Sequence, residues 1–420
     1  MQEKQIYFPS LENVKAASKN LEGVAYKTPL NQNVTFSKEF DATILFKRED
    51  LQVVRSYKIR GAYNKMSSLN TDEKKCGIVC ASAGNHAQGV ALSCKLLKIK
   101  GTIFMPSPTP NQKINQVKMF GEDFIEVVIE GDTFDDAFNA AKKACDAENK
   151  TFIHPFNDEK VIEGQATVGL EILEQTIKKI DYVFVAVGGG GLSSGLSSVF
   201  KQLSPKTKII GVEPEGAPSM LTSIKNKINT PLDTIDSFVD GAAVKRVGDL
   251  NFAICQQNLY DMITVPEGKV CQTILDLYNK DAIIAEPAGA LSVAALDGFR
   301  SVIKGKNVVC IISGGNNDIT RTAEIKERAL LHSNLKHYFI ITFPQRAGAL
   351  REFVVDILGP NDDITHFEYT KKVSRETGVA VVGIELKSPN DLEPLIAKMK
   401  LHNFYGDYLN DKPDLFQFLV

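Results

Sequence analysis

The sequence contains no tryptophan, no long apolar run and no excess of charge of either sign. Its 49 Lys and Arg residues nearly balance 51 Asp and Glu residues, which argues against nucleic acid or an anionic membrane surface as the main partner. The apolar runs, such as residues 182–187, are far shorter than the roughly 20 residues that a membrane-spanning helix needs. The N-terminal residues lack a basic stretch followed by an apolar one, so no signal peptide is expected. We expect a cytoplasmic protein without nucleic-acid or membrane partners.

Cysteine pairs with metal-ligand spacing are also missing. The chain has seven cysteines, and no two of them have the Cys-x-x-Cys spacing of a zinc ribbon or a redox site. Most stand in apolar contexts, as Cys310 does between Val309 and Ile311. Buried free thiols in a reducing compartment account for this pattern.

The arrangement of apolar runs predicts an α/β fold. The 420 residues are enough for two or three domains. In the central region, short unbroken apolar runs alternate with helical patterns, which is typical of parallel sheets whose strands are covered on both faces. Strands are expected at residues 77–80, 101–105, 124–129, 182–187, 209–212 and 308–312, and helices at 85–97, 112–120, 134–147 and 192–203. Ligands of such sheets bind at the carboxyl ends of the strands.

The pattern changes after the charged helical segment 325–331. The following residues predict strand 338–343, helix 348–358, strands 365–371 and 379–386, and helix 391–401, with 415–420 as a candidate last strand. This βαββα order is that of the ferredoxin-like arrangement, so a separate small α+β domain is expected.

A lysine stands at the start of a predicted helix, in the run Ser-Tyr-Lys-Ile-Arg-Gly-Ala of residues 56–62. The positive potential of a helix N-terminus and of Arg60 would favour the neutral amine of Lys58. A neutral lysine amine is the form that makes a Schiff base with an aldehyde cofactor. Most lysines in such places are solvated surface residues, so the rest of the sequence must decide.

A glycine run between a predicted strand and a predicted helix indicates a phosphate-binding loop. Gly188, Gly189, Gly190 and Gly191, followed by Leu192, bring bare backbone N–H groups close to a ligand at a helix N-terminus. A tight turn rarely uses four glycines. A dinucleotide fingerprint is the competing interpretation, because Glu213 follows at the distance of a ribose-binding acid. That fingerprint requires a third glycine where the chain has Ser193 or Ser194.

Two further loops follow predicted strands. Ser82, Ala83, Gly84, Asn85 and His86 offer backbone N–H groups, an amide and an imidazole, enough to hold a carboxylate and a phenolic oxygen. The plain alternatives are that Asn85 is an ordinary helix N-cap and that His86 only supports the loop. In the second loop, the hydroxyl of Ser313 can hydrogen-bond a ring nitrogen, although this loop alone would be read as a turn.

Taken together, these segments resemble the fold-type II pyridoxal-phosphate (PLP) enzymes, specifically the threonine dehydratase family. The matching segments, in chain order, are residues 28–30, 56–62, 82–89, 188–191, 286–290 and 313–316. Tyr57 stands where the family usually has Phe. The resemblance implies a tryptophan synthase β-like fold of two parallel-sheet subdomains over residues 1–330, with the smaller one, about 52–155, inserted in the larger. Residues 336–420 resemble the ACT-like regulatory domain of biosynthetic members.

The resemblance also implies residue roles. Lys58 would be the lysine that binds PLP and removes the Cα proton, and Asn85 would hydrogen-bond the phenolic oxygen of the cofactor. Residues 188–191 with Leu192 would hold the phosphate, Ser313 the pyridine nitrogen, and residues 82–86 the substrate carboxylate. The reaction would be β-elimination of L-threonine to 2-oxobutanoate and ammonia, the first step of isoleucine biosynthesis. Serine would be a poorer substrate, because one methyl group discriminates by about 1–3 kcal/mol.

Serine racemases share most of these motifs and are the nearest rival. They carry a second serine where this chain has Ala83, and a methyl group cannot transfer a proton. They also bind a divalent cation through an acidic residue where this chain has Ser219, so no metal is expected. A dehydrogenase that uses the glycine run and Glu213 is the rival of a different class.

The C-terminal segment is implied to mediate feedback inhibition by isoleucine. The predicted strand-to-helix turn at residues 344–350, with Gly348 near the helix start, would suit a small pocket for an amino acid. A purely structural or oligomerisation unit is the alternative. Longer family members carry two such units, so the number of effector sites and any opposing action of valine stay open. The family favours homotetramers, and Glu163 and Glu286 are expected to support the site rather than to react.

Overall fold

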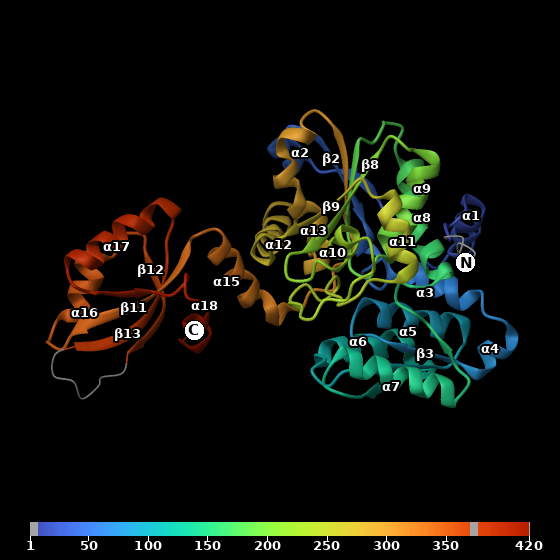
Figure 1. Ribbon diagram of the computed structural model, residues 1–420, viewed down its shortest axis with the longest axis horizontal. Coiled ribbons are helices and arrows are strands. Elements are labelled where there is room, and N and C mark those ends of the chain that lie inside the picture. The colour runs from blue at the N-terminus through green and yellow to red at the C-terminus, as the bar shows by residue number, and fades with distance from the viewer. Residues whose placement is uncertain (1–6, 370–376, 420) are drawn as a thin grey trace. The chain divides into compact units, whose positions relative to one another are not determined.

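The computed structural model describes residues 7–369 and 377–419, and the chain divides into two compact units, Met1–Thr320 and Arg321–Val420 (Figure 1). The strands of the first unit are β1 Leu30–Gln32, β2 Thr43–Arg48, β3 Ile78–Ala81, β4 Gly101–Met105, β5 Ile125–Ile129, β6 Thr151–Phe152, β7 Tyr182–Ala186, β8 Lys208–Pro214, β9 Asp261–Val265 and β10 Asn307–Ile312. Its α-helices are α1 Leu11–Asn20, α2 Val34–Phe40, α3 Lys58–Ser67, α4 Thr71–Cys76, α5 Asn85–Leu97, α6 Asn111–Gly121, α7 Phe134–Ala147, α8 Glu159–Gln175, α9 Gly191–Leu203, α10 Ser219–Asn226, α11 Asp249–Asn258, α12 Glu267–Asp281, α13 Pro287–Ala294 and α14 Arg300–Ile303. Short 3₁₀ turns lie at η1 Glu49–Leu51, η2 Glu122–Phe124, η3 Ala295–Phe299 and η4 Ile319–Arg321.

The first unit contains two sheets. The larger sheet has the order β1-β2-β10-β7-β8-β9 and is parallel except for β1, which pairs antiparallel with β2. The smaller sheet, β5-β4-β3-β6, is parallel throughout. The chain leaves the large sheet after β2, builds the small sheet, and returns at β7. The prediction of parallel sheets is therefore confirmed. The apolar runs are unbroken because strands such as β3, β4 and β10 are buried along nearly their whole length.

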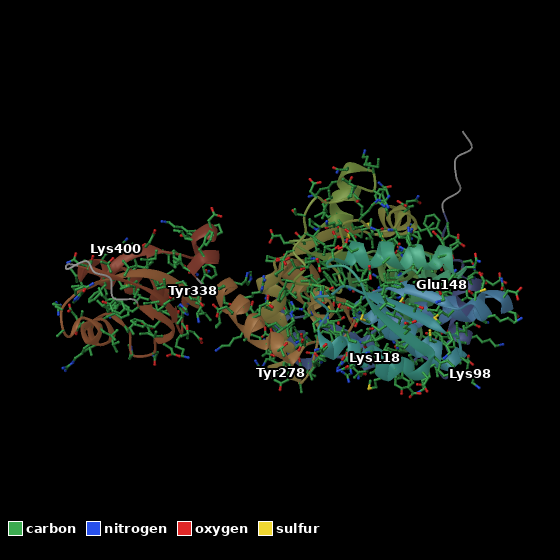
Figure 2. The ribbon with its side chains drawn as sticks, turned by 90° about the horizontal axis from the view of Figure 1, so that it is seen from below. Lys98, Lys118, Glu148, Tyr278, Tyr338 and Lys400 are labelled. Carbon is green, nitrogen blue, oxygen red and sulfur yellow. The ribbon has the colours of Figure 1, made fainter. Side chains whose placement is uncertain are left out.

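The helices that cover the small sheet bury apolar side chains against it and expose charged side chains to solvent. Ile78, Cys80, Val90 and Ile103 belong to one buried cluster between the sheet and its helices. Charged side chains such as Lys98, Lys118 and Glu148 are exposed (Figure 2). This contrast keeps the helices docked on the sheet by their apolar faces.

The cysteines are free thiols. Those at 80, 94, 255, 271 and 310 are buried, whereas Cys76 is exposed and Cys145 is half-buried. Burial raises the pKa of Cys94 to about 12, so its thiol stays protonated and unreactive at neutral pH. The expectation of buried thiols thus fails for Cys76, which lies at the end of a short, exposed helix.

The second unit has a four-stranded antiparallel sheet of order β12-β13-β11-β14. Its elements are α15 Thr322–His332, β11 Lys336–Pro344, α16 Ala349–Glu352, the π-helical turn Phe353–Ile357, β12 Asp363–Tyr369, β13 Thr377–Glu385, the 3₁₀ turn Pro389–Asp391, α17 Leu392–Leu401, β14 Tyr405–Tyr408 and α18 Pro413–Leu419. This order confirms the ferredoxin-like arrangement. The strand predicted at 365–371 begins earlier, at Asp363, and its residues 370 and 371 lie outside the described residues.

The last strand predicted at 415–420 was wrong. Residues up to Leu419 form helix α18, Val420 lies outside the described residues, and β14 is the fourth strand of the sheet. The helix is favoured because Phe416 and Leu419, three residues apart, both pack on the cluster of Tyr338, Val381 and Leu409. Among the described residues, none of the helices is both long and apolar enough to span a membrane.

Candidate active site

Lys58 is the first residue of α3 and lies beside the end of the large sheet. Its Nζ donates to the carbonyl oxygen of Pro155 at 3.1 Å. The preceding residues are tied to the Ser313 loop, since the backbone N–H of Tyr57 donates to the carbonyl of Ser313 at 3.2 Å and Ser56 forms a β-bridge with Gly314. Burial lowers the pKa of Lys58 to about 8, and the Glu286 carboxylate opposes this shift. A sizeable fraction of the amine is therefore neutral near physiological pH.

Arg60 does not act as the sequence suggested. Its guanidinium is buried and forms ion pairs with Glu49 at 2.8 Å and with Glu171 at 2.6 Å. Because the carboxylates of Glu49 and Glu171 offset the charge of Arg60, burial rather than Arg60 is the cause of the low pKa of Lys58. The sequence-based attribution to Arg60 was wrong.

The glycine run follows β7 and leads into α9 without room for side chains. Gly190 has a φ of +93° and is the N-cap of α9, a conformation that favours glycine. A Cβ atom added to Gly188 would lie 2.9 Å from Cα of Ala242, and one added to Gly190 would lie 2.7 Å from Cβ of Asn251. At Gly189 it would overlap the ring of Phe156.

The loop leads directly into Gly191 and Leu192, the first residues of α9. Backbone N–H groups in the first turn of a helix have no partner within the helix. The geometry is that of an anion cradle.

Asn85 is held in one orientation by two neighbours. Its Nδ2 donates to Oε1 of Glu286 at 2.6 Å, and its Oδ1 accepts from Nδ2 of Asn316 at 2.6 Å. The N-cap of α5 is Gly84, with Asn85 as the first helical residue, so the interpretation of Asn85 as an ordinary N-cap was wrong. Burial, followed by the Asp240 carboxylate, raises the pKa of Glu286 to about 7.

The structure brings Ser313 to the same place. Ser313 follows β10, is 3% exposed, and its hydroxyl lies 3.3 Å from the carbonyl oxygen of Ala288, to which it donates. The next residue, Gly314, lies so close to Glu286 that an added Cβ would overlap the carboxylate. Lys58, Asn85 and Ser313 are thus connected through Tyr57, Glu286 and the backbone of residues 313–314.

Burial holds His86, the second residue of α5, in the neutral state. Burial, with a further contribution from Lys58, lowers the pKa of His86 to about 3. Its Nε2 lies 2.9 Å from the carbonyl oxygen of Ile153, so Nε2 carries the proton. Its Nδ1 is buried without a hydrogen-bond partner among the described residues. Ser82, Ala83 and Gly84 are half-buried, and the hydroxyl of Ser82 accepts from the backbone N–H of Gly84 at 3.2 Å.

Glu213 is committed to a structural role. Its carboxylate accepts from the backbone N–H groups of Met220 at 2.7 Å and Leu221 at 2.9 Å, in the first turn of α10. Burial raises its pKa to about 8. A ribose would have to compete with both N–H donors, which weakens the dinucleotide interpretation. The hydroxyl of Ser219 donates to the carbonyl of Val244, and within the described part of the chain no group of three His, Cys, Asp or Glu residues could hold a metal ion.

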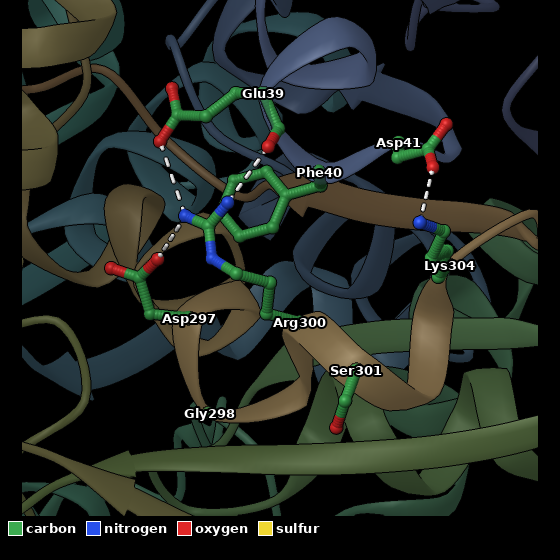
Figure 3. A pocket seen from close by; sticks show the side chains of 8 residues that line it. All are labelled: Glu39, Phe40, Asp41, Asp297, Gly298, Arg300, Ser301 and Lys304. Atoms are coloured by element: carbon green, nitrogen blue, oxygen red, sulfur yellow. Dashed lines mark hydrogen bonds and ion pairs between the residues drawn. The ribbon is translucent and has the colours of Figure 1, made fainter.

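An open pocket of about 460 Å³ on the first unit is lined by none of the predicted site residues. Figure 3 shows Arg300 lying over the ring of Phe40, 4.2 Å from its centroid. The guanidinium also donates to the carbonyl oxygen of Glu39 at 2.7 Å and to Asp297 at 2.9 Å. The polar groups of this pocket therefore pair with one another and join α2 to the η3–α14 segment.

Several site residues were missed from the sequence. Phe156, Asn251 and Ala242 shape the glycine loop, and Asn316 orients Asn85, but none was assigned a role. The segment after β6 could have drawn attention, because it carries Pro155 and Phe156 at a strand end. It was overlooked because β6 has only two residues.

Two family models match the chain. Residues 21–314 match the model described as pyridoxal-phosphate dependent enzyme, and residues 327–419 match the model described as C-terminal regulatory domain of threonine dehydratase. The fold and the site thus define a PLP-dependent enzyme with a regulatory domain.

Full-length relatives narrow this class. The L-threonine dehydratase biosynthetic IlvA of Halalkalibacterium halodurans is 53% identical over 98% of this chain and 99% of its own. The chain belongs to the biosynthetic threonine dehydratase family.

Solved structures agree on the fold. The processed form of threonine deaminase isoform 2 from Solanum lycopersicum matches with a TM-score of 0.72 and 39% identity, over 77% of this chain and 96% of that one. Maize serine racemase matches with a TM-score of 0.71 and 28% identity, over 78% of this chain and 99% of that one. The fold alone therefore does not separate dehydratase from racemase.

Proposed function

We propose that this protein converts L-threonine to 2-oxobutanoate and ammonia by PLP-dependent β-elimination, as the first step of isoleucine biosynthesis in the cytoplasm. The observation that carries the proposal is the place of Lys58, the first residue of α3, beside the Ser313 loop to which Tyr57 is hydrogen-bonded. The full-length similarity to a biosynthetic threonine dehydratase supports the substrate.

The described residues fit the cofactor. The glycine loop packs so closely on Ala242, Phe156 and Asn251 that it has no room for side chains, and it leads into the first N–H groups of α9, which suits a phosphate. Asn85 has its amide orientation set by Glu286 and Asn316, so it can offer a fixed donor to the phenolic oxygen. The hydroxyl of Ser313 suits the pyridine nitrogen. Bound PLP supplies an electron sink for negative charge at Cα of the amino acid.

Residues of the protein would carry out proton removal, bind the substrate carboxylate and contact the pyridine nitrogen. Lys58, once its amine is free, removes the Cα proton, and a base with a pKa near 8 is well matched to this task. The loop of residues 82–86 holds the substrate carboxylate. His86 stays neutral, so its Nδ1 remains an acceptor for a ligand donor. Ser313, unlike a carboxylate, does not force a proton onto the pyridine nitrogen, which suits elimination.

Racemisation needs a second acid on the opposite face of Cα. Ala83 precedes Gly84 in the loop beside Asn85, and its methyl group carries no proton to transfer. We therefore propose that this chain catalyses dehydration rather than racemisation.

The test is 2-oxobutanoate release from L-threonine, with Lys58→Ala as the control. Rapid release that disappears in the variant supports both the reaction and the lysine. If the protein shows the visible absorbance of lysine-bound PLP but releases no product, the assignment of PLP as cofactor stands and threonine is refuted as the substrate. Serine and other β-substituted amino acids would then be tested.

We further propose that isoleucine inhibits the enzyme through the second unit and that the protein is a homotetramer. The match of residues 327–419 to a threonine dehydratase regulatory domain supports an amino-acid effector. Threonine kinetics across an isoleucine titration, repeated with valine, test the control. Kinetics unchanged by isoleucine would refute it, and sedimentation analysis that finds a monomer or dimer would refute the tetramer.

A further inference from the structure

Thr28 and Arg60 belong to the matching motif segments but have no role in the proposed reaction, and the structure brings them together. They belong to a buried charge cluster formed by Lys47, Glu49, Arg60 and Glu171. Arg60 is 1% exposed, and Lys47 and Glu49 are 0% exposed. Two cations match two carboxylates, which is how a protein tolerates charges removed from water.

All three nitrogens of the Arg60 guanidinium donate hydrogen bonds. Nε and Nη2 donate to the two oxygens of Glu49, both at 2.8 Å, and Nη1 donates to Glu171 at 2.6 Å. Nη1 also donates to the hydroxyl of Thr167 and Nη2 to the carbonyl of Tyr26, both at 3.1 Å. Thr28 completes the cluster by donating its hydroxyl to Glu49 at 2.5 Å. A lysine could not reproduce this planar set of bonds.

The partners of Arg60 lie on the segments that join the two sheets. Glu49 follows β2, where the chain leaves the large sheet, and Glu171 is on α8, where the chain returns from the small one. Helix α3 packs against both α8 and α5 (Figure 1). A Cβ atom added to Gly164 of α8 would lie 2.7 Å from Cα of Gly61, so the backbones of α3 and α8 are almost in contact.

The start of α3 is held by backbone contacts to the Ser313 loop and by the side chain of Arg60. Its N-cap, Tyr57, makes no side-chain capping hydrogen bond. Lys58 and Arg60 are two residues apart, within a single turn of the helix. Whatever fixes Arg60 therefore fixes the backbone that carries the Lys58 amine.

We propose that Arg60 is a positioning residue for Lys58: through Glu49, Glu171 and Thr28, it fixes the first turn of α3 on the large sheet. This inference rests on the proposed function, in which Lys58 binds PLP and removes the Cα proton. It assigns to Arg60 placement of the amine rather than contact with substrate.

Two variants remove the planar guanidinium of Arg60 without leaving a net charge in the buried cluster. We call them the fork variants. Arg60→Lys keeps the positive charge, and the double variant Arg60→Met with Glu49→Gln removes one charge of each sign. Thr28→Val is a milder change that removes only one hydrogen bond to Glu49. Lys65→Met is the matched control, because Lys65 is near the other end of α3 and pairs with Asp158 of the segment before α8.

Each variant is measured for kcat and KM with threonine and for the pH midpoint at which the apoenzyme rebinds PLP. We expect kcat to fall by about 10- to 100-fold in both fork variants, since a displaced catalytic group loses rate steeply. KM should change much less, the midpoint should move, and Thr28→Val should show a smaller effect of the same sign. Lys65→Met should match the wild type.

Folded fork variants with wild-type kcat and midpoint would overturn the proposal. If neither fork variant folds, Thr28→Val decides: a wild-type kcat and midpoint there would also overturn it. A wild-type protein that never attaches PLP to Lys58 would instead refute the proposed function on which the inference rests.

Discussion

The environment of Lys58 predicts how the apoenzyme captures PLP as pH changes. Only the neutral amine attacks the aldehyde, so capture should rise with pH through the pKa of Lys58, which burial lowers to about 8. At pH 7.5 a group with that pKa is about one-quarter neutral, whereas an ordinary lysine is about one-thousandth neutral. The environment therefore gives roughly a 200-fold larger reactive fraction.

Glu286→Gln perturbs this equilibrium in a known direction. The carboxylate raises the pKa of Lys58, so its removal should lower that pKa and move the capture midpoint below the wild-type value. The substitution keeps an oxygen that can accept from Nδ2 of Asn85, so the hydrogen bond survives while the charge is lost.

Capture is followed by the growth of the visible absorbance of lysine-bound PLP after mixing with apoenzyme at a series of pH values. A small lysine derivative measured in parallel removes the intrinsic pH dependence of PLP. Lys58→Ala should give no band. A wild-type midpoint near 10.5, or an upward shift in Glu286→Gln, would refute this account of the amine.

Further predictions follow from other contacts. Gly189→Ala should greatly weaken PLP retention because its methyl group would overlap the Phe156 ring, while Gly298→Ala, with nothing within 4 Å, should retain PLP normally; equal retention by dialysis would contradict the cradle. Glu163→Ala should lower the free energy of unfolding by about 1–3 kcal/mol, measured by urea denaturation, because Glu163 accepts from Tyr7 and Asn13 at 2.8 Å. Phe353→Ala, in the core of the second unit, should destabilise that unit by about 3–5 kcal/mol and abolish the isoleucine response. A normal isoleucine response in this variant would show that effector control does not depend on this core.

Much of the site could be predicted because it follows from strand topology. Gly188 and Ser313 each follow a long, buried parallel strand of the large sheet, and the carboxyl ends of such strands meet at one edge. The unbroken apolar runs made those strands visible in the sequence.

The errors came from contacts between distant residues. The strand β2 was not predicted because it carries Lys47, which is buried only because Glu171, 124 residues away, pairs with it. The influence of Arg60 on Lys58 was overestimated because Glu49 and Glu171, 11 and 111 residues away, neutralise it. Helix α18 was mistaken for a strand because its apolar residues pack on Tyr338, far earlier in the chain.

The most direct test of the central claim is to locate the lysine that binds PLP. Reducing the bond between PLP and the holoenzyme makes the attachment permanent, and mass spectrometry of the peptides then identifies the modified residue. The structure predicts a single modified lysine, Lys58, whose amine burial keeps partly neutral. A modification at any other lysine, or none in protein that releases 2-oxobutanoate from threonine, would contradict the account.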